Sequence, residues 1–161
     1  MPDMLVNLLR LPPLGPELEA MGGAGVVVRR AQTWESSQVR GFVARVFNER
    51  WADEIAVGFA RQPVTVYVAL REGRPVGFAA YECTRRNFFG PTGVSESERG
   101  RGVGRALLLA CLWGLREMGY VYGIIGGAGP TTFYEQAVGA IPIPDSDPGI
   151  YEGSIIRAVE D

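Results

Sequence analysis

The sequence predicts a mixed α/β sheet, and the order of its elements is the main reason. In the middle of the chain, three consecutive strands are expected at 64–70, 75–84 and 87–94, and the first two form a hairpin. Strand–helix units follow: an apolar helix at 102–118, a buried strand at 120–125 and a short helix at 131–138. A hairpin followed by strand–helix units is typical of a mixed sheet flanked by helices.

Local patterns predict the remaining elements. Residues 26–29 favour a short strand, and helices are expected at 33–48 and 53–61. Gly90-Pro91 interrupts the third strand, where we expect a bulge or a local edge because proline donates no ladder hydrogen bond. The tail, 141–159, is expected to form two short strands around a turn.

The first 25 residues are expected to be a lead-in segment, followed by a single domain at 26–161. Leu5, Leu8 and Leu9 have helical spacing, but the prolines at 12, 13 and 16 are expected to stop any helix. The glycine-rich stretch 21–25 indicates a flexible joint. We find no internal repeat.

Residue types that are absent exclude several chemistries. The 161 residues contain no histidine and no lysine, so all 16 basic residues are arginine. This excludes Ser-His-Asp triads, HExxH zinc sites, the P-loop lysine and lysine Schiff bases. Two cysteines, Cys83 and Cys111, are too few for a structural zinc site, and we expect both to be reduced core thiols with no metal bound.

Charge and hydropathy narrow the partners. The formal net charge is −2 and the isoelectric point is near 5.3, so no basic field favours a nucleic acid or an anionic membrane as partner. We expect no targeting segment, and the longest apolar run is far shorter than the roughly 20 residues of a membrane span. We therefore expect a soluble cytoplasmic protein.

The segment Arg99-Gly100-Arg101-Gly102-Val103-Gly104-Arg105 is the most informative motif. It opens the long helix, whose first amides lack intrahelical acceptors and therefore form a natural seat for a pyrophosphate. A dinucleotide fingerprint would need a third glycine where Arg105 stands, and a P-loop would need a lysine. A plain glycine-rich turn with solvated arginines remains the alternative.

This motif resembles the acetyl-CoA loop of the GNAT superfamily of N-acyltransferases. The family pattern, [Gln/Arg]-x-x-Gly-x-[Gly/Ala], fits 99–104 at every fixed position, and Phe133–Ala140 resembles the family's F-Y-E-K-x-G-F stretch. The resemblance spans 26–140 and implies a central sheet of six to seven strands flanked by helices. Residues 88–94 and 124–130 look like a bacterial subgroup whose substrate is unassigned.

The resemblance also implies roles for individual residues. Tyr134 would act as general acid toward the departing sulfur, and the Val94 amide would lie near the thioester carbonyl. The pantetheine arm would pair beside Gly93 and Val94, and the pyrophosphate would lie on the loop amides. The implied acetyl-CoA-binding residues are Gly93, Val94, Arg99, Gly100, Arg101, Gly102, Val103, Gly104 and Arg105.

The general base and the acceptor pocket are less defined. Family members often carry a glutamate early on the fourth strand, where this chain has none, so Glu82 is the first candidate base, followed by Glu54 and Glu152. A water chain, or an amine that arrives neutral, would need no base. The first two helices carry aromatic residues that either line an acceptor pocket or pack in the core: Trp34, Phe47 and Trp51.

We therefore expect an acetyl-CoA-dependent N-acetyltransferase that acts directly on a primary amine of a small molecule or peptide. The alternative is a non-catalytic acyl-CoA sensor of the same fold. The sequence leaves open the acceptor, the acyl group, and whether the protein is a monomer or a homodimer.

Overall fold

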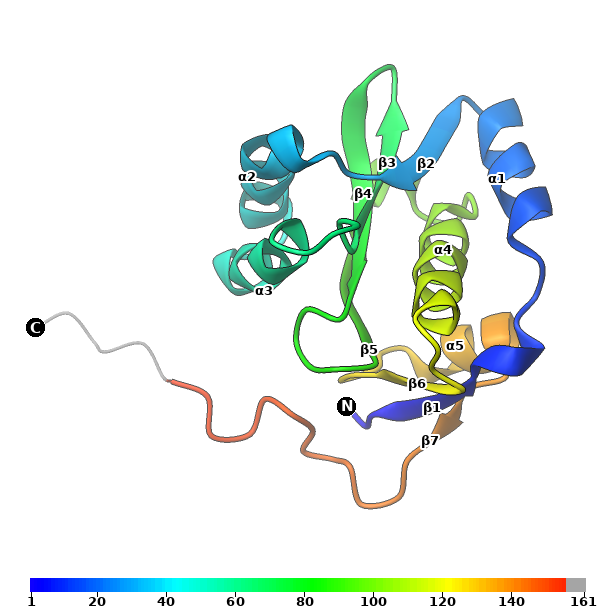
Figure 1. Ribbon diagram of the computed structural model, residues 1–161, viewed down its shortest axis with the longest axis vertical. Coiled ribbons are helices and arrows are strands. Elements are labelled where there is room, and N and C mark those ends of the chain that lie inside the picture. The colour runs from blue at the N-terminus through cyan, green and yellow to red at the C-terminus, as the bar shows by residue number, and fades with distance from the viewer. Residues whose placement is uncertain (156–161) are drawn as a thin grey trace, which may run out of the picture.

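The computed structural model describes residues 1–155, and its centre is one mixed sheet (Figure 1). The order of the seven strands is β2-β3-β4-β5-β6-β1-β7. Their bounds are β1 Met4–Asn7, β2 Val26–Arg30, β3 Val66–Arg71, β4 Arg74–Tyr81, β5 Phe88–Val94, β6 Tyr122–Ile125 and β7 Ile141–Pro142. The mixed sheet and its size agree with the prediction.

Five α-helices cover the sheet: α1 Leu14–Gly23, α2 Ser36–Val46, α3 Glu49–Phe59, α4 Val103–Glu117 and α5 Thr131–Val138. Helices α2 and α3 lie on one face, and α4 lies on the other with α1 beside it (Figure 1). Each face has its own apolar core, because α4 buries ten residues on one side while Phe42, Val43 and Ile55 are buried on the other. Burial of this apolar area is the main stabilising contribution.

The parallel contact between β5 and β6 is short. The two strands pair only at Phe88↔Ile124 and Phe89↔Ile125, whereas all other neighbours are antiparallel. Between β4 and β5 the register shifts after Ala79↔Thr92, so that Gly90-Pro91 forms the predicted bulge. Beyond this bulge, β5 has no partner on its β6 side.

The N-terminal segment differs from the prediction, because residues 1–25 contribute two elements to the fold. Strand β1 lies between β6 and β7, and α1 packs against α4. Pro16 does not stop α1, since it stands in the first turn, where an amide has no intrahelical acceptor. Part of the expected joint, 21–23, is the last turn of that helix. The Trp113 Nε1–H donates to the Pro12 carbonyl and fixes the connection.

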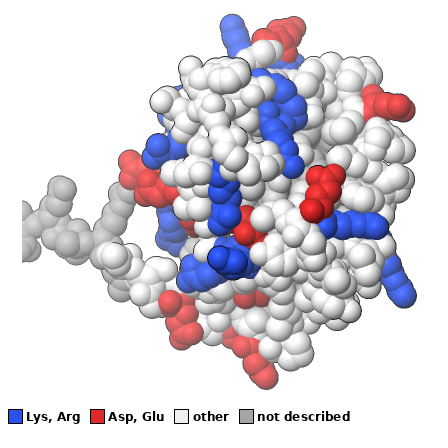
Figure 2. All heavy atoms as spheres, viewed as in Figure 1, with Lys and Arg blue, Asp and Glu red and all other residues white. Residues whose placement is uncertain are grey.

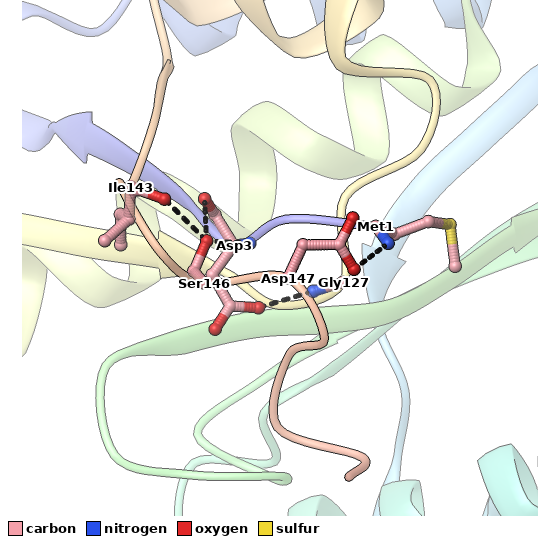
Figure 3. Close-up of polar contacts among 6 residues, drawn as sticks. All are labelled: Met1, Asp3, Gly127, Ile143, Ser146 and Asp147. Carbon is pink, nitrogen blue, oxygen red and sulfur yellow. Dashed lines mark hydrogen bonds and ion pairs between the residues drawn. The ribbon is translucent and has the colours of Figure 1, made fainter.

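The tail is fastened to the N-terminus rather than extended as two strands. Only β7 is a strand within 141–155, and the rest of the expected second strand, 156–159, lies outside the described residues. In Figure 3 the buried Asp3 carboxylate accepts the Gly127 N–H at 2.7 Å. The Ser146 hydroxyl accepts the Asp3 N–H and donates to the Ile143 carbonyl. The Met1 ammonium pairs with Asp147 at 2.9 Å.

Other expectations need small corrections or none. Helix α3 begins at Glu49 rather than at 53, because the Asn48 side chain accepts the Trp51 N–H as an N-cap. Cys83 and Cys111 are free and buried, as expected.

On the face shown in Figure 2, arginine and carboxylate side chains are interspersed. Among residues 1–155, no helix has the length and apolarity to cross a membrane. In the same range, no cluster of metal-ligating side chains is present.

Candidate active site

The glycine loop forms a left-handed turn directly before α4. Gly100 and Gly102 have φ angles of +73° and +88°, a region that residues with a Cβ rarely adopt. Gly102 is the N-cap of α4, and its carbonyl accepts the Ala106 N–H. The preceding amides of the first turn, those of 103–105, have no intrahelical acceptors and carry the positive end of the helix dipole. The amides that the motif predicts as an anion seat are thus free of helix hydrogen bonds, and their role in binding a pyrophosphate stays a prediction.

A buried glutamate anchors this loop to the sheet. Glu98 accepts two hydrogen bonds from Arg71 at 2.8 and 2.9 Å, and Arg101 lies 3.8 Å from its second oxygen. The hydrogen bonds from Arg71 hold the pKa of the Glu98 carboxyl below its ordinary value. The loop is thus fixed by β3 and not only by its own backbone.

The opening between β5 and β6 contains a cavity of about 470 Å³. The Ser95 N–H bonds to Val76 on β4, so by strand alternation the Val94 N–H and carbonyl face the open side. The Val94 carbonyl accepts the Arg99 Nε–H at 3.1 Å. Of the predicted cofactor residues, Gly93, Val94, Arg99 and Gly104 line this cavity. We call it the cofactor cavity.

A second cavity of about 400 Å³ adjoins the first. Both are lined by Trp51, Phe89, Thr92, Gly129 and Tyr134, so they meet at a shared rim. The second cavity is also lined by β6, the loop after it and tail residues Ile150 and Tyr151. We call it the acceptor cavity. A thioester in one cavity and a nucleophile in the other would meet at this rim.

Tyr134 stands at the shared rim, in α5. Its side chain is 6% exposed, and its ring packs edge-on against Phe133 and Phe89, with centroids 5.0 and 6.4 Å away. Burial raises the pKa of Tyr134 to about 12. The phenol therefore keeps its proton at neutral pH and is available as a donor.

Two predicted site residues are held by other contacts. The Arg105 side chain donates to Glu17 at 2.8 Å and to the Ala137 carbonyl at 3.1 Å, so only its amide faces the anion seat. Glu82 is 3% exposed, accepts the Asn87 N–H and lies 3.7 Å from Arg61. It lines neither cavity, and these contacts hold the turn between β4 and β5.

Sequence reasoning placed some acceptor residues and missed others. Phe47 lines the cofactor cavity and Trp51 lines both, whereas Trp34 is 76% exposed. Arg50 and Tyr151 line the acceptor cavity and were not singled out. No sequence signal pointed to Tyr151, because it is brought there by the fastened tail. The neighbouring Glu54 accepts the Tyr151 hydroxyl at 3.0 Å and also pairs with Thr84.

A family model described as an acetyltransferase (GNAT) domain matches residues 62–137, from β3 through the glycine loop to Tyr134. Residues 62–137, just under half of the chain, are thus similar to a GNAT acetyltransferase domain. A comparison with curated proteins gives no match. The architecture of a mixed seven-stranded sheet between two helical layers is that of GNAT acetyltransferases of known structure.

Similar solved structures come from diverse GNAT proteins. One is the GCN5-related glucosamine N-acetyltransferase region of a fungal multi-domain β-N-acetylglucosaminidase (TM-score 0.71, 16% identity, 88% of this chain and 19% of that one). Another is a GCN5-related N-acetyltransferase from Sphaerobacter thermophilus (TM-score 0.63, 21% identity, 88% of this chain and 48% of that one). A GNAT family acetyltransferase from Brucella melitensis was solved with acetyl-CoA (TM-score 0.51, 19% identity, 68% of this chain and 80% of that one). This chain spans about half or less of the length of the first two proteins.

The residues of this site fit acetyl-CoA. The left-handed glycine turn exposes α4 amides for the pyrophosphate, and the unpaired edge of β5 offers Val94 to an extended arm. A Cβ at Gly104 would meet Val94 and Phe133 at 3.7 and 3.9 Å, so this glycine borders the cofactor cavity directly.

Proposed function

We propose that this protein transfers an acetyl group from acetyl-CoA directly to a primary amine of a small molecule or peptide. The observation that carries the proposal is the shared rim: Tyr134 and Thr92 border both the cofactor cavity at the glycine loop and the acceptor cavity. The arrangement supports direct transfer, because both cysteines are buried in the cores and neither lines these two cavities.

The proposed step forms a C–N bond and breaks the C–S bond of the thioester. The amine nitrogen attacks the carbonyl carbon, and the Val94 N–H stabilises the developing oxyanion. As the C–S bond breaks, Tyr134 donates its proton to the departing sulfur. The attacking nitrogen loses one proton as the amide forms, and the uptake of one proton by Tyr134 from solvent restores the balance.

Removal of the amine proton does not use a carboxylate in either cavity, since no Asp or Glu of residues 1–155 lines them. We propose that the amine arrives neutral and that water in the acceptor cavity accepts the one proton that its nitrogen loses. The Glu54 carboxylate accepts the Tyr151 hydroxyl, and Tyr151 lines the acceptor cavity.

Calorimetric titration with acetyl-CoA, followed by a thiol-release assay over a panel of amines, tests the proposal. We expect saturable binding and amine-dependent release of CoA with a matching N-acetyl product by mass spectrometry. Absence of binding at millimolar acetyl-CoA would contradict it.

The second candidate is a non-catalytic acyl-CoA sensor, favoured by the lack of a carboxylate in the cavities. It predicts the same binding with no acetylated product for any amine. The two candidates therefore differ in turnover and not in affinity.

A further inference from the structure

We infer that the acceptor is an amine with an aromatic or apolar body that also carries an anionic group, which Arg50 binds. This inference rests on the proposed function and specifies its acceptor. It depends on what lines the acceptor cavity and on the state of one arginine.

The walls of the acceptor cavity are largely apolar and aromatic. Aromatic rings come from α3, β5, α5 and the tail, namely Trp51, Phe88, Phe89, Tyr134 and Tyr151, and Ile125 and Ile150 add aliphatic surface. Flat aromatic walls favour a ligand with a ring or an extended apolar body. A strongly hydrated polyol would lose water here without gaining enough polar partners.

Arg50 is the only charged side chain among the described residues that line this cavity. It lies in the first turn of α3, next to Trp51, and its guanidinium is 5.6 Å from the centroid of the Tyr151 ring. Stacking on an aromatic ring orients an arginine without using its N–H donors.

The Arg50 guanidinium has no carboxylate partner within residues 1–155, and this distinguishes it from most arginines near the site. Arg71, Arg101 and Arg105 are each paired with a glutamate. Glu54, one turn along α3 from Arg50, instead accepts Thr84 and Tyr151. The N–H donors of Arg50 therefore remain available for a bidentate contact with a carboxylate or phosphate.

The placement of Arg50 also sets the orientation of the acceptor. Arg50 lines only the acceptor cavity, whereas Tyr134 borders the thioester side as well. An acceptor bound with its anionic group at Arg50 thus presents its amine toward the shared rim. A second cation on the acceptor would find no carboxylate in the cavity and would face Arg50, so diamines are disfavoured.

Three acceptors of one shape test this: para-(aminomethyl)benzoate, para-(aminomethyl)benzamide and para-xylylenediamine, which differ in the charge of the distal group. We expect kcat/KM for the benzoate to exceed that for the benzamide by about tenfold or more, and the diamine to be poorest. In Arg50→Gln the benzoate-to-benzamide ratio should fall toward one. Arg45→Gln, which removes an exposed arginine of α2 outside both cavities, should keep the wild-type ratio.

The same acceptors are also titrated into the CoA-loaded protein, with the heat of binding in a calorimeter as readout. Equal affinity for all three, or an unchanged ratio in Arg50→Gln, overturns the inference. If the benzamide is acetylated without any charge preference, the proposed function stands and only this inference fails. If the benzoate binds selectively through Arg50 without turnover, Arg50 binds the anionic group as inferred, but the transferase proposal fails and the ligand is not an acceptor.

Discussion

The two cavities of this protein are built in different ways. The proposed anion seat of the cofactor cavity is one stretch of seven residues, 99–105, in which backbone amides would provide the binding groups. The acceptor cavity draws residues from the N-terminus, α3, β5, the loop after β6 and the tail. Backbone recognition suits a constant ligand such as a pyrophosphate, whereas side chains from separate segments can vary with the acceptor.

This contrast predicts that changes in the two cavities separate binding of acetyl-CoA from choice of acceptor. Changes in the glycine loop should abolish all activity through loss of acetyl-CoA. Changes in the acceptor cavity should alter KM or selectivity for the amine with acetyl-CoA affinity preserved.

The largest effect is expected for Gly104→Glu. The new side chain starts beside Val94 and Phe133 at ordinary contact distance and places a carboxylate in the cofactor cavity. Repulsion of the pyrophosphate should weaken acetyl-CoA binding by at least about a hundredfold, measured by calorimetry.

Gly41→Glu is the matched control, because Gly41 is also a helical glycine whose Cβ would have only one contact, at 3.6 Å. Both variants should fold, since replacing a helical glycine favours the helix. If Gly104→Glu and the wild type bind acetyl-CoA with equal affinity, the pyrophosphate does not bind at this loop.

Tyr134→Phe should lower kcat by about a hundredfold or more and leave acetyl-CoA affinity nearly unchanged. The reason is that the ring stays packed against Phe89 and Phe133 while the proton donor is lost. Because burial raises the pKa of Tyr134 to about 12, wild-type activity should show no loss of this proton between about pH 7 and 10.

Steady-state kinetics across pH, with Tyr122→Phe as control on the exposed part of β6, provides the measurement. A kcat for Tyr134→Phe equal to that of wild type would assign the acid role to another group.

Glu98→Gln should weaken acetyl-CoA binding more mildly, by roughly tenfold or less, since it loosens the loop without entering the cavity. It should also lower thermal stability at neutral pH. The folded-state pKa of Glu98 is lowered by Arg71, so its contribution is present above the unfolded value and is lost as pH falls through the folded one.

Thermal unfolding of both proteins from about pH 7 down to pH 3 checks this. The difference in melting temperature should narrow on acidification below about pH 4. A constant difference would mean that Glu98 does not act through its charge.

Tyr151→Phe is expected to have the smallest effect. It removes the hydrogen bond to Glu54 while the ring still covers the acceptor cavity. The KM for the amine should rise by about two- to tenfold, with acetyl-CoA affinity unchanged. Acceptor kinetics measure the KM, and titration of the same variant measures the acetyl-CoA affinity. A changed acetyl-CoA affinity would contradict the separation of the two cavities.

Local sequence predicted most elements from Val26 to Val138 and the glycine loop, because each depends on neighbouring residues. The glycines at 100 and 102 permit the left-handed turn, and the apolar run of α4 requires burial. Local sequence did not predict β1 and α1. Met4 and Val6 alternate with less buried residues as in a strand, and the prolines before α1 are compatible with a helix that starts after them.

The sequence by itself determined the fold class, because the order of the elements follows from local patterns. It also led to the proposed pyrophosphate seat, through a motif of consecutive residues, and to the candidate acid Tyr134, through the family resemblance. Only the tertiary structure decided where the acceptor cavity lies and that Arg50 is left unpaired there within the described chain. It also decided that Glu82 is occupied elsewhere. The place of the cavity and the partners of Arg50 and Glu82 depend on which distant segments of the chain meet. Contacts such as the one between Asp3 and Gly127 bring these segments together only in the folded chain.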